Sequence, residues 1–223
     1  FSSTGDPIWA NWFRYHPITN LQVADVDGDG KAEVMVGTVY FTPLTVHNYD
    51  GSFRWSTLEQ VGSEGNATTP RRGINMTKMC LVDLDLDGIR EIIYGTADGW
   101  VFAVKPQDGA EVWHLNIVGE VTGLLVNRGK LIIASEYGDV YGMGFDGDIL
   151  WRHHIADRIQ DLVAVGDNEL GVVCNFKRLT RIDQGGLVAG SHTFDFEIRH
   201  IHPCPDGVVY CLDGGHIGRL VTS

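Results

Sequence analysis

Short apolar runs separated by polar turns follow one another along the chain. The runs are rich in Val, Ile, Leu and Tyr, and the turns between them are made of Gly, Asp and Asn. This pattern is typical of antiparallel strands joined by hairpins. No stretch of about a dozen residues has the apolar spacing of an amphipathic helix. The sequence therefore predicts an all-β protein.

The expected strands fall into a repeat. The segment VADVDGDGKAEVMVGT at residues 23–38 returns as LVDLDLDGIREIIYGT at residues 81–96. A second element, an Asp-Gly pair followed after three residues by tryptophan, ends at Trp55, Trp113 and Trp151. Weaker copies bring the number of units to five, at about residues 18–56, 75–115, 121–154, 158–194 and 197–221. Small antiparallel sheets repeated in this way predict a five-bladed β-propeller of four-stranded blades, as a single domain over residues 1–223.

The two ends of the chain complement each other in this scheme. The last unit stops after its third expected strand, while Gly5 and Trp9 have the spacing of Gly51 and Trp55. We therefore expect an N-terminal strand at residues 6–13 to complete the last blade, which leaves no unpaired edge. In the alternative, a neighbouring molecule receives this strand, and the protein is a strand-exchanging fibre subunit. Closure within one chain is favoured because the N-terminal strand would then supply the fourth strand of the fifth unit, so that the chain contains five complete units.

Two cysteines fit the same repeat. Cys174 and Cys211 align with Gly37 and Gly95 at the end of the second strand of a unit. Equivalent positions on neighbouring blades are too far apart for a disulfide bond. We expect both thiols to be free and buried.

Each of the first two units carries a dense acidic loop between its first two expected strands. Three aspartates at alternate positions precede a glycine, and a glutamate follows at the ninth position of the loop. Oxygen ligands spaced in this way suit Ca2+, whereas an EF-hand needs its glutamate at position 12 and a helix on each side. The expected ligands, with a backbone carbonyl at the seventh position, are Asp25, Asp27, Asp29, Lys31 and Glu33 in the first loop and Asp83, Asp85, Asp87, Ile89 and Glu91 in the second. The alternative is a solvated turn held by Asx hydrogen bonds, but the repulsion of four like charges favours a bound ion.

The motifs DVDGDGKAEVMVGT and DLDLDGIREIIYGT resemble the FG-GAP/VCBS-type repeats of integrin α-subunit propellers and of many bacterial surface proteins. That resemblance implies a propeller whose loop between the first and second strands of a blade binds calcium. Glu33 and Glu91 stand where the family usually has Asp. The segments around Trp113 and Trp151 also resemble the blade repeat of pyrroloquinoline-quinone-type propellers, which implies the fold and not their redox chemistry.

Charge and motif content narrow the function. A formal net charge of −12 argues against a nucleic-acid surface, and no apolar run is long enough to insert into a membrane. We expect no enzyme, because the sequence has no Gly-x-Ser-x-Gly, His-Glu-x-x-His or phosphate-binding glycine motif. His200, His202 and Cys204 alternate on one expected strand, but such a trio more often lines a channel than binds a metal.

These observations favour a calcium-binding structural, adhesion or ligand-binding module that is extracellular or at the cell surface, secreted or periplasmic. Its partner would be a protein or a glycan. The long irregular segment at residues 61–77 is a candidate binding loop, and Asn66 and Asn75 have the form of glycosylation acceptors. The alternative from another class is the propeller domain of a calcium-dependent carbohydrate-active enzyme, similar to a polysaccharide lyase.

Overall fold

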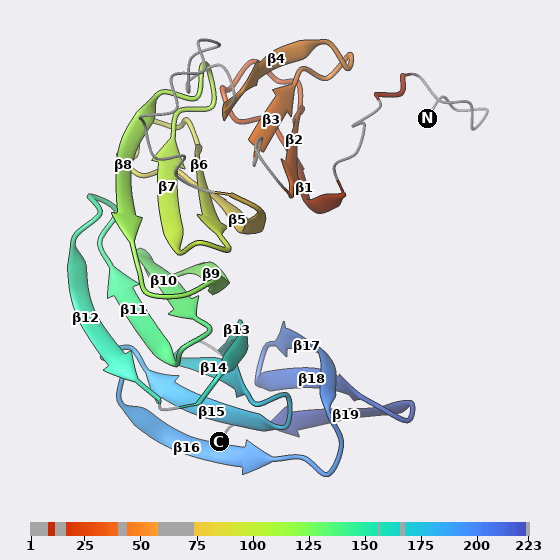
Figure 1. Cartoon of the computed structure of the whole chain (residues 1–223), viewed down its shortest axis with the longest axis vertical. Coiled ribbons are helices and arrows are strands. Elements are labelled where there is room, and N and C mark those ends of the chain that lie inside the picture. The colour runs from red at the N-terminus through yellow and green to blue at the C-terminus, as the bar shows by residue number, and fades with distance from the viewer. Residues whose placement is uncertain are drawn as a thin grey trace. The chain divides into compact units, whose positions relative to one another are not determined.

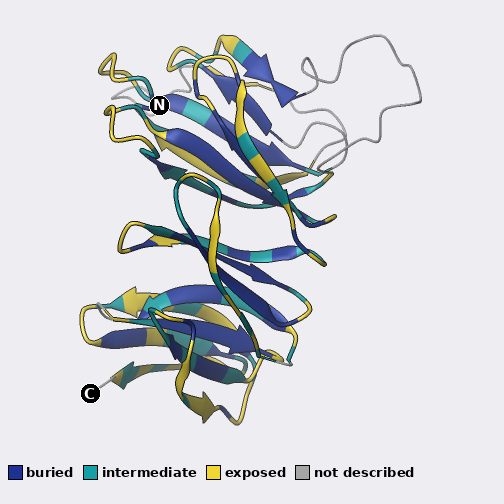
Figure 2. Ribbon diagram, turned by 90° about the vertical axis from the view of Figure 1, so that its left-hand side faces the viewer, coloured by how far each residue is buried: buried dark blue, intermediate teal, exposed yellow. Residues whose placement is uncertain are grey.

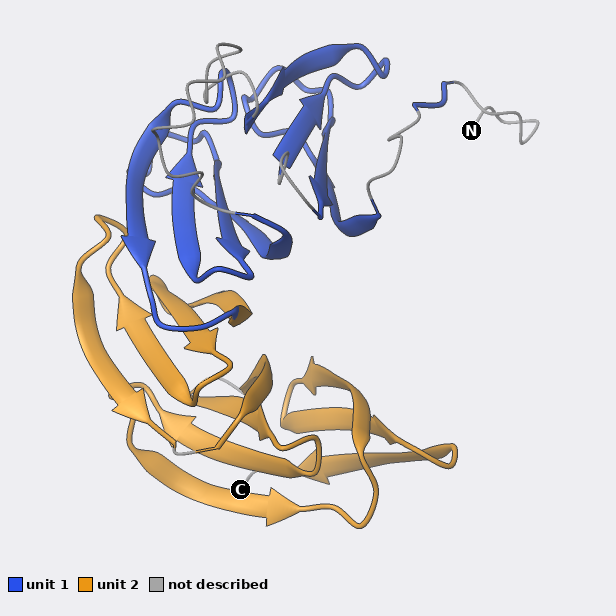
Figure 3. Ribbon diagram, viewed as in Figure 1, with its two compact units in different colours: residues 1–120 blue, residues 121–223 orange. Residues whose placement is uncertain are grey.

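The computed structural model describes residues 9–11, 17–39, 44–57, 74–155, 157–165 and 168–221. Within these ranges lie nineteen β-strands, which form antiparallel sheets of neighbouring strands in chain order (Figure 1). The chain divides into two compact units, residues 1–120 and residues 121–223 (Figure 3). Each unit is described by itself below. In the described part of the chain, no helix is long and apolar enough to cross a bilayer.

The first unit contains two four-stranded sheets. The first sheet consists of β1 (Ile18–Ala24), β2 (Glu33–Thr38), β3 (Leu44–His47) and β4 (Phe53–Ser56). The second sheet consists of β5 (Met76–Val82), β6 (Glu91–Thr96), β7 (Trp100–Val104) and β8 (Glu111–Asn116). Every neighbouring pair is antiparallel, which confirms the prediction of an all-β chain built from four-stranded antiparallel sheets.

The second unit continues the series. The third sheet consists of β9 (Val121–Asn127), β10 (Lys130–Ser135), β11 (Asp139–Met143) and β12 (Ile149–His154). The fourth sheet consists of β13 (Ile159–Val165), β14 (Glu169–Cys174), β15 (Arg178–Asp183) and β16 (Val188–Thr193). The fifth sheet has three strands among the described residues, namely β17 (Ile198–Cys204), β18 (Gly207–Leu212) and β19 (His216–Val221).

Burial follows the position of a strand in its sheet. The middle strands are apolar on both faces, and all six residues of β6 are buried. The outer strands β8 and β12 instead have mostly exposed residues, with half-buried residues between them. Figure 2 shows buried residues in dark blue along the middle strands. The fourth sheet shows one reason for such burial, because it packs on the third sheet with one face and on the fifth with the other.

The core of the first unit lies between its two sheets. Met35, Leu44 and Trp55 of the first sheet form one cluster with Met76 and Ile92 of the second. The two sheets approach closely at Gly37, where an added Cβ would lie 2.3 Å from the sulfur of Met76. Only glycine leaves room for the methionine side chain there.

The second unit has two such cores. One cluster joins Ile132 and Val140 of the third sheet to Ile159 and Leu162 of the fourth. A further cluster joins the fourth sheet to the fifth; its fully or largely buried members are Val163, Val165, Val173, Leu179, Phe194, Ile198, Val208 and Leu212. Each sheet therefore packs face to face on the next one within its unit.

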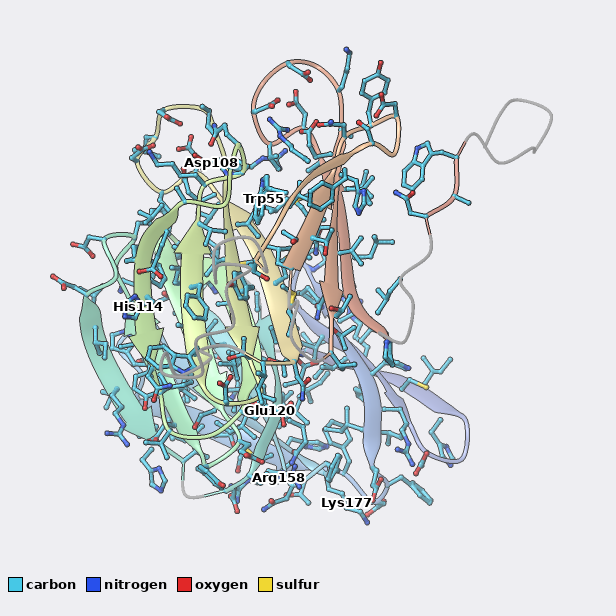
Figure 4. The ribbon with its side chains drawn as sticks, turned by 45° about the horizontal axis from the view of Figure 1, so that its top comes forward. Trp55, Asp108, His114, Glu120, Arg158 and Lys177 are labelled. Atoms are coloured by element: carbon cyan, nitrogen blue, oxygen red, sulfur yellow. The ribbon has the colours of Figure 1, made fainter. Side chains whose placement is uncertain are left out.

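Outer-strand tryptophans fasten one sheet to the next. Trp55 on β4 donates its indole N–H to the carbonyl oxygen of Pro106, at 2.8 Å, in the turn between β7 and β8. Figure 4 shows Trp55 beside the turn that carries Asp108. Trp151 on β12 lies against Gly186 in the corresponding turn of the fourth sheet, where an added Cβ would be 2.6 Å from the indole. The tryptophan of the repeat thus reaches across to the following sheet.

The alignment of the cysteines needs one correction. Cys174 is free and buried as expected, and Cys211 is free but half-buried. Cys174 pairs with Ile159 in the same way that Thr96 pairs with Met76, so it matches Thr96 and not Gly95. Cys211 does match Gly95, because it pairs with His200 as Gly95 pairs with Lys78.

The predicted N-terminal strand lies mostly outside the described residues. Of residues 6–13, the structure describes 9–11, which are not in a strand. The number of blades, the closure of the last blade and the single domain over residues 1–223 stay predictions.

Candidate metal centre

The first acidic loop connects β1 to β2 and is curled by its own aspartates. Asp25 accepts backbone N–H groups from Gly28 at 2.8 Å and from Gly30 at 3.0 Å. Asp29 accepts the N–H of Lys31 at 2.8 Å. Gly28 and Gly30 have φ values of 77° and 83°, a left-handed conformation that glycine adopts without steric cost.

The second loop connects β5 to β6 and repeats this geometry. Asp83 accepts backbone N–H groups from Asp87 at 3.1 Å and from Gly88 at 2.9 Å. Asp87 accepts the N–H of Ile89 at 2.7 Å. Both loops therefore lie between strands, where the sequence placed them, and bring their aspartates to one side of a tight turn.

Ligand atoms converge in both loops. Among the described residues, two groups of acidic, His or Cys side chains offer three ligand atoms within 4.8 Å of one another: Asp25, Asp27 and Asp29, and Asp83, Asp85 and Glu91. Carboxylate oxygens in such a cluster are the ligands that Ca2+ takes. Six of the eight carboxylates expected from the sequence lie in these groups. Glu33 and Asp87 do not, although the backbone N–H of Asp87 donates to Asp85 at 3.3 Å.

Among the acidic side chains of the loops, the two glutamates are the buried ones. Glu33 is 2% exposed and Glu91 is 6% exposed. Glu33 accepts the N–H of Val26 at 3.3 Å, and Glu91 accepts the N–H of Leu84 at 3.0 Å, so each ties the end of its loop back to the start. Desolvation raises the pKa of Glu33, because burial disfavours its charged form.

An arginine that the sequence reading missed enters the first loop. Nη2 of Arg54 lies 2.5 Å from Oδ2 of Asp27, and Nη1 lies 3.6 Å from Oε1 of Glu33. The hydrogen bond from Arg54 lowers the pKa of Asp27. Arg54 comes directly before Trp55, and Val112 has the same place before Trp113. That difference between the two repeats was visible in the sequence, but only the fold shows that this position faces the loop.

A second arginine links the two loops. Arg90, which follows Ile89 in the second loop, donates from Nη2 to the carbonyl oxygen of Asp25 at 2.7 Å. Its backbone N–H also donates to the carbonyl oxygen of Val26 at 3.3 Å. The backbone of the first loop is therefore held by the second, which neither motif alone predicts.

One residue in the second loop has an unfavourable backbone conformation. Leu86 takes the place of Gly28 with a φ of 63°, and its side chain is 82% exposed. Leu86→Gly should stabilise the protein by about 0.5–1 kcal/mol, because relief of the left-handed strain exceeds the entropy that glycine adds to the unfolded chain. Thermal unfolding measures this, and Gly28→Leu in the first loop should have the opposite effect. A lower melting temperature for Leu86→Gly would show that the leucine side chain makes a stabilising contact.

The other candidate residues are not brought together in the same way. The strand register pairs His200 with Cys211 and His202 with Val209, so the trio of His200, His202 and Cys204 does share one face of the fifth sheet. It is not among the groups with converging ligand atoms in the described residues. Asn66 and residues 61–73 of the candidate binding loop lie outside the described ranges, while Asn75 is described and has a φ of 56°.

Comparison with known proteins finds similar solved structures but no matching family. No family model and no curated protein matches the chain. Among solved structures, it is similar to BBS1N, crystallised in complex with ARL6DN, at 12% identity and a TM-score of 0.67 over 97% of this chain. It is also similar to BamB from Moraxella catarrhalis, at 16% identity and a TM-score of 0.61 over 86% of this chain, and to Saccharomyces cerevisiae Sqt1, at 12% identity and a TM-score of 0.73 over 92%. The fold is that of a β-propeller domain.

The match extends over only part of the similar structures. The chain spans 66% of the BBS1N chain, 61% of BamB and 60% of Sqt1. At these identities the likeness concerns the propeller fold alone.

Proposed function

We propose that this propeller domain binds two calcium ions, one in each acidic loop, and acts as a structural, adhesion or ligand-binding module outside the cell. The observation that carries the proposal is the pair of three-ligand clusters, each at the same place between the first two strands of a sheet. A surface turn with no ion would have to hold these like charges together against their repulsion.

The chemistry of the loops favours calcium over other metals. The side-chain ligands are carboxylates, which suit hard cations, and the loops contain neither His nor Cys for zinc. The loops are open at the surface, since Asp29, Asp85 and Asp87 are exposed. Room for six to eight ligands and water suits calcium better than the strict octahedron of magnesium.

The extracellular part of the proposal rests on affinity. Modules outside the cell meet calcium at concentrations that fill weak sites, with dissociation constants of about 10⁻⁴ to 10⁻³ M. An exposed loop with a carboxylate-bound arginine, as in the first sheet, suits a site of this weak class. The resemblance to FG-GAP/VCBS-type repeats supports the same setting.

Isothermal titration with CaCl2 of the chelator-treated protein tests the proposal. We expect binding to both loops, with the second loop the tighter one, because Arg54 competes with an ion for Asp27 and Glu33 in the first. Arg54→Gln should strengthen the weaker site. MgCl2 is the comparison ion and should bind less tightly. Absence of heat and of any calcium-induced spectral change would reject the calcium sites.

A further inference from the structure

The turn between β14 and β15, in the second unit, has an unusual backbone conformation for its residues. Asn175 and Phe176 have φ values of 47° and 61°, so both lie in the left-handed region. Asparagine is tolerated there, but a bulky side chain is an outlier. In the β6–β7, β10–β11 and β18–β19 turns, the positive φ values fall on glycines. Of these four turns, the one in the fourth sheet therefore places a phenylalanine where glycine would avoid strain.

The ring of Phe176 gains only part of the burial that would offset this strain. Phe176 is 42% exposed. Phe194, which follows β16, is 6% exposed and belongs to the core between the fourth and fifth sheets. Residues in strained backbone conformations concentrate at binding and active sites. The exposed ring on a strained turn therefore points to a contact with another molecule.

Hydrogen bonds to the start of β13 and to β17 hold the turn in this conformation. The backbone N–H of Asn175 donates to the carbonyl oxygen of Arg158 at 2.9 Å. The backbone N–H of Phe176 donates to Oε1 of Gln160 at 2.8 Å, and its carbonyl oxygen accepts the N–H of Ile198 at 2.6 Å. The ring is therefore presented by a rigid turn, which lowers the conformational entropy lost on binding.

A second exposed ring lies beside this turn. Phe196, in the connection between β16 and β17, is 45% exposed. Its ring stacks on that of His216, with the centroids 5.0 Å apart and 20° between the ring planes. The connection runs along the turn, since the N–H of Phe194 donates to the carbonyl oxygen of Lys177 at 2.8 Å. Both exposed phenylalanines therefore lie at the same end of the fourth and fifth sheets.

Carboxylates flank the second ring. Asp195 is exposed, and no ion pair to its carboxylate exists among the described residues. The ammonium group of Lys177 donates instead to the backbone carbonyl oxygen of Asp195, at 3.1 Å. The side chain of Glu197 is 41% exposed and lies 3.5 Å from Arg199, whose short, bidentate hydrogen bonds go to Asp213. Carboxylates next to aromatic rings suit a cation, because the face of a ring also attracts positive charge.

We propose that Phe176, Asp195, Phe196 and Glu197 form a docking surface for a segment of another protein in which an arginine or lysine lies next to an apolar side chain. The apolar side chain contacts the exposed rings, and the cation pairs with the carboxylates. The formal net charge of −12 also favours a basic partner. Rigid aromatic side chains are common anchors at such interfaces.

Other occupants fit this surface less well. Asp195 and Glu197 would repel the phosphates of a nucleic acid or of an anionic membrane. A second copy of the chain carries the same net charge, so association of two copies would bring like charges together. Charge complementarity therefore favours a basic segment of a different protein.

Thermal unfolding of two variants of the whole chain separates binding from packing. Phe176→Gly should change the melting temperature by about 2 °C or less, because relief of the left-handed strain offsets the loss of a partly exposed ring. Phe194→Ala, the matched change in the core, should lower it by roughly 6–20 °C. If Phe176→Gly lowers it as much as Phe194→Ala, the ring serves packing and the proposal is overturned.

Selection of a displayed random-peptide library on the immobilised chain tests the docking surface itself. We expect the enriched peptides to carry Arg or Lys within a few residues of an apolar side chain. A labelled peptide from this set should bind about tenfold more weakly to Phe176→Gly, and about two- to fivefold more weakly to Asp195→Asn. Leu187→Gly and Asp148→Asn are the controls, since both side chains are exposed and lie in other turns. These two variants should leave the affinity unchanged.

The proposal is overturned if no peptide is enriched, if the enriched peptides are acidic, or if Phe176→Gly binds them as tightly as the parent protein. An oligomer that dissociates in Phe176→Gly, as measured by light scattering, would identify a second copy as the occupant and would also overturn it. Peptide affinity should be equal in CaCl2 and in chelator, because the docking surface contains no residue of the acidic loops. Failure of the calcium sites would therefore leave this result unchanged.

Discussion

Asp85→Ala should abolish most of the stabilisation that calcium gives the second sheet. Asp85 is one of the three converging ligands of the second loop, and the second repeat has Val112 where the first has Arg54. A site filled at 100 times its dissociation constant contributes about 2.7 kcal/mol to the free energy of unfolding, which corresponds to roughly 5–10 °C in a domain of this size. Thermal unfolding with CaCl2 and with chelator measures this increment for the parent protein and the variant.

The corresponding change in the first loop should have a smaller effect on the calcium increment. In Asp27→Ala, the guanidinium of Arg54 keeps Glu33 as a partner and continues to occupy the ligand side of the loop. Asp148→Ala serves as the control, since Asp148 is an exposed carboxylate on the turn between β11 and β12. Equal melting temperatures of the parent protein in calcium and in chelator would contradict the proposed sites.

Trp55→Ala should be among the most destabilising single substitutions. Trp55 is 4% exposed, packs in the core between the first and second sheets, and donates its indole N–H to Pro106. Truncation of a buried tryptophan costs about 3–5 kcal/mol, which lowers the melting temperature by roughly 6–20 °C. Chemical denaturation of the variant measures the loss in free energy.

Two further variants separate the causes. Trp55→Phe keeps an aromatic ring but removes the hydrogen bond to Pro106, so it should lose an intermediate amount of stability. Phe53→Ala on the same strand should change little, because Phe53 is 51% exposed. A loss for Trp55→Ala no greater than that for Phe53→Ala would show that the inter-sheet contact contributes nothing.

The sequence predicted the structure best where a residue type has a specific structural role, such as glycine in a tight turn or aspartate in an acidic loop. Alternating aspartates before Gly30 and Gly88 predicted loops between strands, and the structure has them between β1 and β2 and between β5 and β6. Backbone N–H groups within each loop donate to Asp25 or Asp83, so much of the turn is held by local hydrogen bonds. Such features can be read from a few consecutive letters.

Contacts between repeats were harder to predict. Arg54 acts on the first loop from β4, and Arg90 reaches from the second loop to Asp25, so their roles depend on how strands and sheets are stacked. The position of Cys174 was wrong by one residue because small side chains were used to align the repeats, whereas the strand register decides the match. Trp9 was matched by its spacing alone, and its contact with the turn at Tyr49 came only with the structure.

Arg54 also gives the two loops different responses to their surroundings. Its positive charge is part of the chain, so dilution or a chelator cannot remove it, while an ion held by Asp83, Asp85 and Glu91 equilibrates with the solution. When free calcium falls, we therefore expect the turn before β6 to loosen first and the turn before β2 to keep its shape. Unfolding in solution with little calcium would then begin in the second sheet, because its acidic loop has no counterpart of Arg54.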